Sequence, residues 1–256
     1  MPDDDELKTA AARALACLDL TNLDDDCTAE DVRALCDRAL TPHGPVAAVC
    51  VWPRFVSVAR AALGGSGVRI ATVVAFPGGD DDTGAVMQLT QQAVTEGADE
   101  IDMVIPYKAL LEGHPQLVTS AVARTRDAAG GAQVKAILET GVLGDAELIR
   151  QAAELAVEGG ADFLKTSTGK VPINATPEAA RVMLEVIAQA DHPVGLKPAG
   201  GVKTTQDAAA YLALCDEVMG ADWARPAVFR IGASSVLTAL LATLNGEEPA
   251  DVGEGY

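Results

Sequence analysis

Two lysines of this chain stand where apolar side chains are expected. The segment "ADFLKTSTGK", residues 161–170, places Lys165 beside Phe163 and Leu164 in a run that is typical of a buried strand. A second lysine, Lys197, has the same kind of position in "VGLKPAG". Lysine is almost never fully buried unless its ammonium group is paired or has a chemical task. We expect the two strands to be neighbours, which brings the two ammonium groups close together.

A pair of neighbouring ammonium groups can activate one of its amines. At about 5 Å and an effective dielectric constant near 20, two unit charges repel by about 3 kcal/mol, which corresponds to about two pKa units. One amine is therefore expected to lose its proton near neutral pH, and a neutral amine forms Schiff bases with aldehydes and ketones. The alternative is structural: both ammonium groups pair with Asp102, Glu100 or Glu139 and only stabilise the core.

An internal repeat brings a carboxylate into the same arrangement. The segments "EGADEIDMVIP" and "GGADFLKTSTG" both carry Gly-Ala-Asp before a strand, and aligning Asp99 with Asp162 gives Asp102 the same offset as Lys165. On alternate strands of a barrel, these side chains point inward at similar depth. The same alternation turns Lys135 of "VKAILET" inward. Several inward charges are not how a purely structural core is built.

The fold class follows from eight β-rich runs that alternate with alanine-rich helical segments. The runs are "ALACLDLT", "AAVCVWP", "RIATVVAF", "EIDMVIP", "QVKAILET", "DFLKTST", "VGLKPAG" and "VFRIGASS". Strands that recur every roughly 23 to 35 residues with helices between them predict a parallel sheet with helical crossovers. Eight such units in 256 residues favour a single-domain α/β fold, a (β/α)8 TIM barrel, over the alternative of an open doubly wound sheet. We assign residues 1–245 to the barrel and residues 246–256 to an acidic C-terminal tail.

The loops after the last three strands have the composition of a phosphate site. They are rich in glycine and serine, and small residues let backbone N–H groups and a helix N-terminus approach an anion. The loops after the seventh and eighth strands are the usual place for a phosphate in such barrels. The candidate phosphate-binding residues are Gly169, Gly200, Gly201, Gly232, Ser234 and Ser235, together with the adjacent cation Lys170. The alternative is that these glycines only serve turns.

Composition and charge limit the possible partners. With 49% hydrophobic residues, 22% charged residues and no apolar run of about 20 residues, a globular protein without a membrane span is expected. The net charge of −18 disfavours nucleic acids and anionic membrane surfaces as partners. The acidic start "MPDDDELK" has no signal-peptide features, so we expect a cytoplasmic location.

The cysteines and histidines indicate neither a disulfide framework nor a metal centre. The five cysteines contain no Cys-x-x-Cys pair and are expected to be free thiols. His43, His114 and His192 each lie beside Gly or Pro in an expected loop, so a cluster of histidine ligands is not expected. We therefore predict no metal and no other cofactor.

Five segments together resemble one enzyme family. The segments "ADFLKTSTGKVPINATPEAARVML", "VGLKPAGGVKTTQDA", "ADEIDMVIPYKAL", "AAVCVWPRFV" and "FRIGASS" are similar in order and spacing to those of the bacterial 2-deoxyribose-5-phosphate aldolases, over about residues 13–240. The resemblance implies a metal-independent class I aldolase on a (β/α)8 barrel and a homodimer or larger homo-oligomer. It also implies reversible cleavage of 2-deoxy-D-ribose 5-phosphate to acetaldehyde and D-glyceraldehyde 3-phosphate.

The family motifs assign roles to residues of this chain. By this resemblance, Lys165 is the Schiff-base nucleophile, Lys197 is its activating partner and Asp102 is the proton-transfer carboxylate. Three more residues match supporting positions of the active site, namely Asp19, Cys50 and the terminal Tyr256, and Lys135 joins them through the strand alternation described above. Two alternatives stay open: another lysine-dependent sugar-phosphate aldolase or transaldolase, and a non-catalytic barrel that binds a sugar phosphate.

Overall fold

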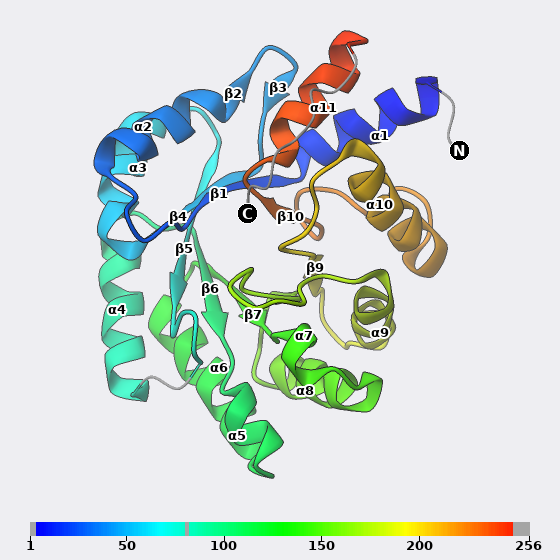
Figure 1. Cartoon of the computed structure of the whole chain (residues 1–256). Coiled ribbons are helices and arrows are strands. Elements are labelled where there is room, and N and C mark those ends of the chain that lie inside the picture. The colour runs from blue at the N-terminus through cyan, green and yellow to red at the C-terminus, as the bar shows by residue number, and fades with distance from the viewer. Residues whose placement is uncertain (1–3, 80–81, 248–256) are drawn as a thin grey trace.

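Eight parallel strands form a barrel in the computed structural model, which describes residues 4–79 and 82–247 (Figure 1). The strands are β1 (Leu18–Asn22), β4 (Ala48–Val51), β5 (Arg69–Val74), β6 (Glu100–Val104), β7 (Gln133–Ile137), β8 (Phe163–Lys165), β9 (Gly195–Lys197) and β10 (Ile231–Ala233). They pair in the order β10-β1-β4-β5-β6-β7-β8-β9. Parallel bridges between Leu196 and Phe229 and between Ala199 and Gly232 join the two ends of this order. The predicted (β/α)8 barrel is confirmed, and the open doubly wound sheet is excluded because the strand order does not reverse.

A ring of helices covers the outside of the barrel (Figure 1). The helices are α1 (Asp4–Ala16), α2 (Ala29–Arg38), α3 (Val56–Leu63), α4 (Thr83–Thr95), α5 (Tyr107–Leu111), α6 (Gln116–Ala129), α7 (Thr140–Leu143), α8 (Ala146–Glu158), α9 (Pro177–Ile187), α10 (Thr205–Met219) and α11 (Val236–Asn245), with a 3-10 turn at Pro53–Phe55. A small hairpin of β2 (Leu40–Thr41) and β3 (Gly44–Pro45) follows α2. The first helix, α1, packs against α10 and α11.

Local sequence signals set the ends of these helices. Thr204 begins α10 in a capping box with Asp207, which satisfies backbone N–H groups that have no partner within the helix. Gly97 and Gly160 have positive φ angles of 109° and 86° after α4 and α8, a conformation that glycine adopts readily at helix C-termini. Gly159, the C-cap residue of α8, keeps a φ of −72°. These glycines end α4 and α8 shortly before β6 and β8 begin.

The barrel separates an apolar outer core from a polar interior. Ile101 and Met103 on β6 are fully buried in the core between the strands and the helices. Asp102, between them, is also fully buried but belongs to the interior cluster described below. Gly195 of β9 makes room for an aromatic ring inside the barrel, since an added Cβ would lie 2.3 Å from Cε1 of Phe163. The predicted inward direction of Asp102 is confirmed.

Three further expectations concern the cysteines, membrane spans and the C-terminal tail. All five cysteines are buried and free, as predicted: Cys17, Cys27, Cys36, Cys50 and Cys215. Within residues 4–79 and 82–247, every helix is too short or too polar to cross a bilayer. Residues 248–256, which include Tyr256 and most of the expected tail, lie outside the described residues. The assignment of the tail and of Tyr256 therefore stays a prediction.

Candidate active site

Lys165, Lys197 and Asp102 meet inside the barrel. Strands β8 and β9 are hydrogen-bonded neighbours, as predicted, and the structure places Lys165 in register with Lys197. Asp102 of β6 accepts a hydrogen bond from each ammonium group through one oxygen: its Oδ2 lies 2.8 Å from Lys165 Nζ and 2.7 Å from Lys197 Nζ. All three side chains are buried. The alternation of side chains along the strands thus places an amine pair and a carboxylate within direct contact.

Two predicted supporting residues extend this cluster. Lys135 of β7 is in register with Asp102 and donates to its Oδ1 at 2.8 Å, and to Oε2 of Glu100 at 2.5 Å. Asp19 of β1 lies on the other side, where its Oδ2 is 2.5 Å from Lys197 Nζ. Asp102 therefore receives hydrogen bonds from three ammonium groups, and Lys197 is paired with two carboxylates.

Arg230 is a member of the cluster that the sequence analysis missed. Its guanidinium group forks onto Glu100, at 2.7 and 3.0 Å, and Nη1 also donates to Oδ1 of Asp19 at 2.7 Å. The side chain is only 2% exposed. A usable signal was present in "FRIGASS", where Arg230 is two residues before Gly232 and so shares its face of the strand. A single arginine in an apolar strand is the same anomaly that singled out Lys165.

The surroundings shift the pKa values of the two lysines in opposite directions. Burial lowers the pKa of Lys165, the nearby Asp102 carboxylate opposes this, and the charge of Lys197 lowers the pKa further, so that it ends below that of an ordinary lysine. Burial also disfavours the charged form of Lys197, but Asp102 and Asp19 more than compensate and raise its pKa. The predicted asymmetry is present. Burial, rather than the repulsion between the two amines, is the largest cause of the lowered pKa of Lys165, and the second carboxylate, Asp19, distinguishes Lys197 from it.

The pKa values of the two carboxylates, Asp102 and Asp19, are both lowered by the cations around them. Burial alone would raise the pKa of Asp102, but Lys135, Lys165 and Lys197 together hold it well below its usual range. For Asp19, burial is likewise outweighed by Lys197 and other cations, and the pKa is lowered. Both groups therefore stay ionised, and Asp102 is a weak base in the resting site.

Cys50 lies beside the charged residues but in an apolar wall. It is fully buried and packs with Leu23, Ala71 and Val73 inside the barrel. Burial raises the pKa of its thiol, so the group is neutral at physiological pH. The structure thus places Cys50 as a small lining group of the site.

Glu139 is one of the three carboxylates considered as a partner of the lysine ammonium groups, but it makes other contacts. It follows β7 with a positive φ of 57°, and its carboxylate accepts hydrogen bonds from the backbone N–H and the hydroxyl of Thr168, at 3.1 and 2.6 Å. The salt bridges found among the described residues join the lysines to Asp19, Glu100 and Asp102 instead. Glu139 therefore connects the loop after β7 to the loop after β8.

The glycine-rich loops gather at the carboxyl ends of β8, β9 and β10. Gly169, Gly200 and Gly201 have φ angles of 82°, 79° and 85°, which other residues rarely adopt. A Cβ on Gly201 would meet no atom within 4 Å, so the space beside its backbone is open. Gly232 differs, because a Cβ there would lie 3.0 Å from Cε of Lys197. Its small size makes room for a catalytic candidate; a contact with phosphate stays a prediction.

The serines and Lys170 border the same loops. Ser235 is the N-cap residue of α11, and its buried Oγ has no hydrogen-bond partner among the described residues. A hydroxyl donor at a helix N-terminus is suited to an anion. Ser234 precedes it in the same turn, and Nζ of Lys170 donates to the carbonyl oxygen of Leu23 at 2.8 Å. Lys170 thereby reaches from the loop after β8 to the loop after β1.

The three histidines lie apart from this site. His43, His114 and His192 are all exposed, and His43 pairs with Asn245 near the end of α11. Within the part of the chain that the structure describes, no group of three or more His, Cys, Asp or Glu side chains is arranged to hold a metal ion.

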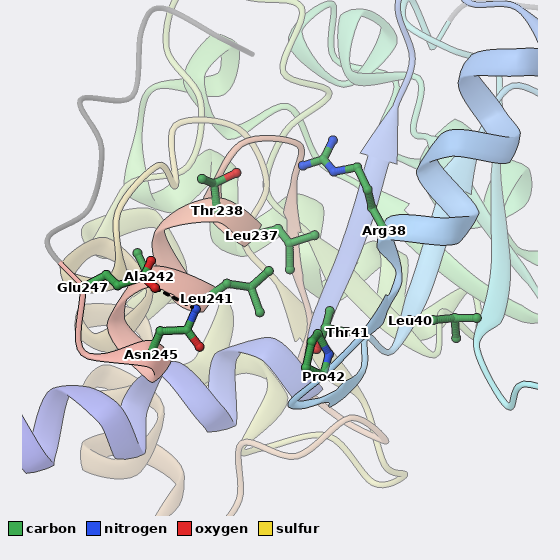
Figure 2. Close-up of a pocket in the computed structure, with 10 residues that line it drawn as sticks. All are labelled: Arg38, Leu40, Thr41, Pro42, Leu237, Thr238, Leu241, Ala242, Asn245 and Glu247. Carbon is green, nitrogen blue, oxygen red and sulfur yellow. Dashed lines mark hydrogen bonds between the residues drawn. The ribbon is translucent and has the colours of Figure 1, made fainter.

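A groove elsewhere on the surface is separate from these residues (Figure 2). It has a volume of about 420 Å³ and lies between α11 on one side and the end of α2 with the β2–β3 hairpin on the other. Leu237 and Leu241 line one side, and Thr41 and Pro42 line the other. None of the residues that line it belongs to the lysine cluster, so we do not assign it to catalysis.

A barrel whose interior holds a lysine pair beside a carboxylate is suited to Schiff-base chemistry. The model of the DeoC/LacD family of aldolases matches residues 13–238. A curated deoxyribose-phosphate aldolase from Agrobacterium fabrum (strain C58) is 51% identical over 251 residues, which is 97% of each chain. The chain therefore belongs to the DeoC/LacD family of aldolases and is a carbon–carbon lyase.

Solved structures agree on the fold. A protein from Toxoplasma gondii ME49 has a TM-score of 0.87 at 23% identity, and the match covers 96% of this chain and 98% of that one. The deoxyribose phosphate aldolase from Aeropyrum pernix, which has a tetrameric structure, has a TM-score of 0.76 at 24% identity over 94% of this chain and 98% of that one.

Proposed function

We propose that this chain is a class I aldolase that cleaves 2-deoxy-D-ribose 5-phosphate reversibly to acetaldehyde and D-glyceraldehyde 3-phosphate. The observation that carries the proposal is the buried pair of Lys165 and Lys197, in register on adjacent strands and sharing one oxygen of Asp102. The 51% identity to a deoxyribose-phosphate aldolase over nearly the whole chain supports the choice of substrate.

The first step is the formation of a Schiff base on Lys165. Its lowered pKa makes the neutral amine accessible, and this amine adds to the aldehyde carbon of the open-chain sugar. Lys197 stays protonated and can donate a proton to the departing oxygen as water leaves. The iminium ion that results carries a positive charge beside Asp102, which already accepts a hydrogen bond from Lys165 Nζ at 2.8 Å. The carboxylate therefore stabilises the intermediate electrostatically.

The second step breaks the bond between C2 and C3. The C3 hydroxyl loses its proton, the bonding electrons move to the iminium nitrogen, and glyceraldehyde 3-phosphate departs from an enamine. Protonation of the enamine at C2 and hydrolysis then release acetaldehyde and restore the amine. Because the neighbouring lysines, Lys135 first, hold the pKa of Asp102 well below its usual range, we assign it to relaying the proton through water rather than to storing it.

The phosphate of the substrate is placed by the loops after β8, β9 and β10. We assign its binding to the backbone around Gly201, the hydroxyls of Ser234 and Ser235, and the charge of Lys170. The Oγ of Ser235 at the start of α11 is buried and has no hydrogen-bond partner in the part of the chain that the structure describes, which supports this placement. Binding energy from the phosphate can then orient the carbon chain toward Lys165.

A coupled assay for glyceraldehyde 3-phosphate, run in the presence of EDTA, tests the activity directly. Trapping with acetaldehyde and borohydride tests the mechanism, and mass spectrometry should find one reduced acetaldehyde unit on Lys165. Lys165→Ala is expected to abolish both signals, whereas Lys8→Ala, on the exposed side of α1, should keep them. Wild-type turnover in Lys165→Ala would overturn the assignment.

The same experiments separate the alternatives. Trapping without cleavage of 2-deoxy-D-ribose 5-phosphate would point to another lysine-dependent aldolase or transaldolase. Ligand binding without trapping or turnover would point to a non-catalytic barrel.

We also propose that the chain forms a homo-oligomer in the cytoplasm. Among the described residues, five large apolar side chains are exposed and are available for a subunit interface: Leu40, Leu111, Leu117, Val142 and Ile173. The homologue from Aeropyrum pernix has a tetrameric structure, and five free thiols suit a reducing compartment. Light scattering after size-exclusion chromatography tests the assembly, and a mass of one chain at micromolar concentration would contradict it.

A further inference from the structure

The barrel interior holds a connected set of charges. Three carboxylates and four cationic side chains, each at most 3% exposed, contact one another there: Asp19, Glu100, Asp102, Lys135, Lys165, Lys197 and Arg230. A fourth buried carboxylate, Glu139, is hydrogen-bonded to Thr168 instead and lies close enough to Lys165 to sense its charge. An unbalanced charge in such a site is costly because water and salt cannot screen it. Within the set that is joined by direct contacts, three of the cations can neutralise the three carboxylates, and the fourth is then in excess.

The contacts indicate which cation is in excess. Arg230 contacts Glu100 and Asp19, Lys197 contacts Asp19 and Asp102, and Lys135 contacts Glu100 and Asp102. The salt bridges of the described residues give Lys165 a single carboxylate oxygen, Oδ2 of Asp102, and Lys197 contacts the same oxygen. Lys165 is therefore the least compensated of the four.

We propose that Glu100 and Arg230 are positioning residues whose opposite charges balance the cluster, so that the amine of Lys165 is neutral in the resting enzyme. This inference rests on the proposed function of Lys165 as the nucleophile. Glu100 and Arg230 act through Lys135, Asp19 and Asp102, which connect them to the reacting amine. Their effect is electrostatic, so charge, rather than shape alone, should decide the outcome of a substitution.

In the described part of the chain, few groups outside the cluster contact Glu100 or Arg230. Besides the members of the cluster, Arg69 of β5 approaches Glu100, at 3.7 Å between Nε and Oε1, but it is half exposed and screened by solvent. The thiol of Cys17 lies close enough to Arg230 to sense its charge, but burial raises its pKa to about 12, so it stays neutral. The ring of Phe163 lies under the guanidinium group at 5.7 Å, and the backbone carbonyl of Pro226 accepts from its Nε. No other ionisable side chain among the described residues is found in contact with the pair.

Four variants test the charge balance by its sign. Arg230→Met removes a positive charge, so Lys165 should hold its proton to higher pH. Glu100→Gln removes a negative charge with almost no change of shape, so Lys165 should lose its proton at lower pH. The double variant removes one charge of each sign, so the pH dependence of the reactivity of Lys165 should return toward that of the wild type. Arg230→Lys keeps the charge and should leave this pH dependence unchanged.

The measurement is the rate of acetaldehyde and borohydride trapping on Lys165 as a function of pH, alongside the pH profile of kcat/KM. A unit charge roughly 10 Å away at an effective dielectric constant near 20 moves a pKa by about one unit. The acidic limb should therefore move up by about one pH unit in Arg230→Met, which lowers the neutral-pH trapping rate about tenfold. It should move down by a similar amount in Glu100→Gln.

The outcomes are distinguishable. If the wild type is not trapped on Lys165, the proposed function fails. If the wild type is trapped but the limb in Glu100→Gln stays in place or moves up, the charge-balance inference is wrong, whatever the folding of Arg230→Met. The remaining outcome concerns the double variant. If its trapping rate is below that of either single variant at every pH and its acidic limb is not shifted, Glu100 and Arg230 have a structural role only.

Discussion

Replacing Lys197 by leucine removes the cation that shares an oxygen of Asp102 with Lys165. Both side-chain nitrogens lie within 2.8 Å of that oxygen, so they are at most about 5.5 Å apart. Two unit charges at about 5 Å and an effective dielectric constant near 20 repel by about 3 kcal/mol. The substitution removes this repulsion and leaves Asp102 and Asp19 with more uncompensated negative charge. Both changes act in the same direction and raise the pKa of Lys165, by about two units or more.

The sign of this change predicts the pH profile. A lysine with a raised pKa is protonated, and therefore not nucleophilic, at neutral pH. We expect kcat/KM of Lys197→Leu to fall about 100-fold near pH 7 and to recover as the pH rises, with a corresponding upward movement of the trapping profile. Lys8→Leu, on the exposed side of α1, is the matched control and should behave as the wild type. An equal loss of activity at every pH, with the acidic limb unmoved, would refute the reasoning and leave Lys197 with a role in proton donation only.

Three further predictions concern packing, phosphate binding and thiol reactivity. Gly195→Ala should lower the free energy of unfolding in urea by about 1–3 kcal/mol, because the new Cβ meets the ring of Phe163; Gly131→Ala, which meets nothing within 4 Å, should change it little, and equal effects would contradict the packing argument. Ser235→Ala should raise KM for the phosphorylated sugar about tenfold or more by removing a hydrogen bond to a charged group, while turnover of unphosphorylated 2-deoxyribose should not change. Cys50 should resist alkylation at pH 8 until the protein unfolds, because its thiol is buried and neutral; mass spectrometry that found rapid modification of the native protein would disprove this.

The sequence by itself determined the strands and the faces of their side chains. Side-chain direction alternates along a strand with a period of two, so Lys165, Lys197, Lys135 and Asp102 could be turned inward from their neighbours in the chain alone. These predictions needed only the next few residues, and the structure confirms them.

Only the tertiary structure decided which charges meet. Arg230 pairs with Glu100, 130 positions away in the chain, because barrel closure brings β10 beside β1 and points both side chains into one interior. The same closure assigns Gly232 to making room for Lys197, and leaves the hydroxyl of Ser235 buried without a partner among the described residues. Burial, which is the largest cause of the lowered pKa of Lys165, is a property of the whole barrel. Contacts across the barrel, and the exclusion of water that follows from them, depend on how eight distant strands pack together, which no local pattern in the chain records.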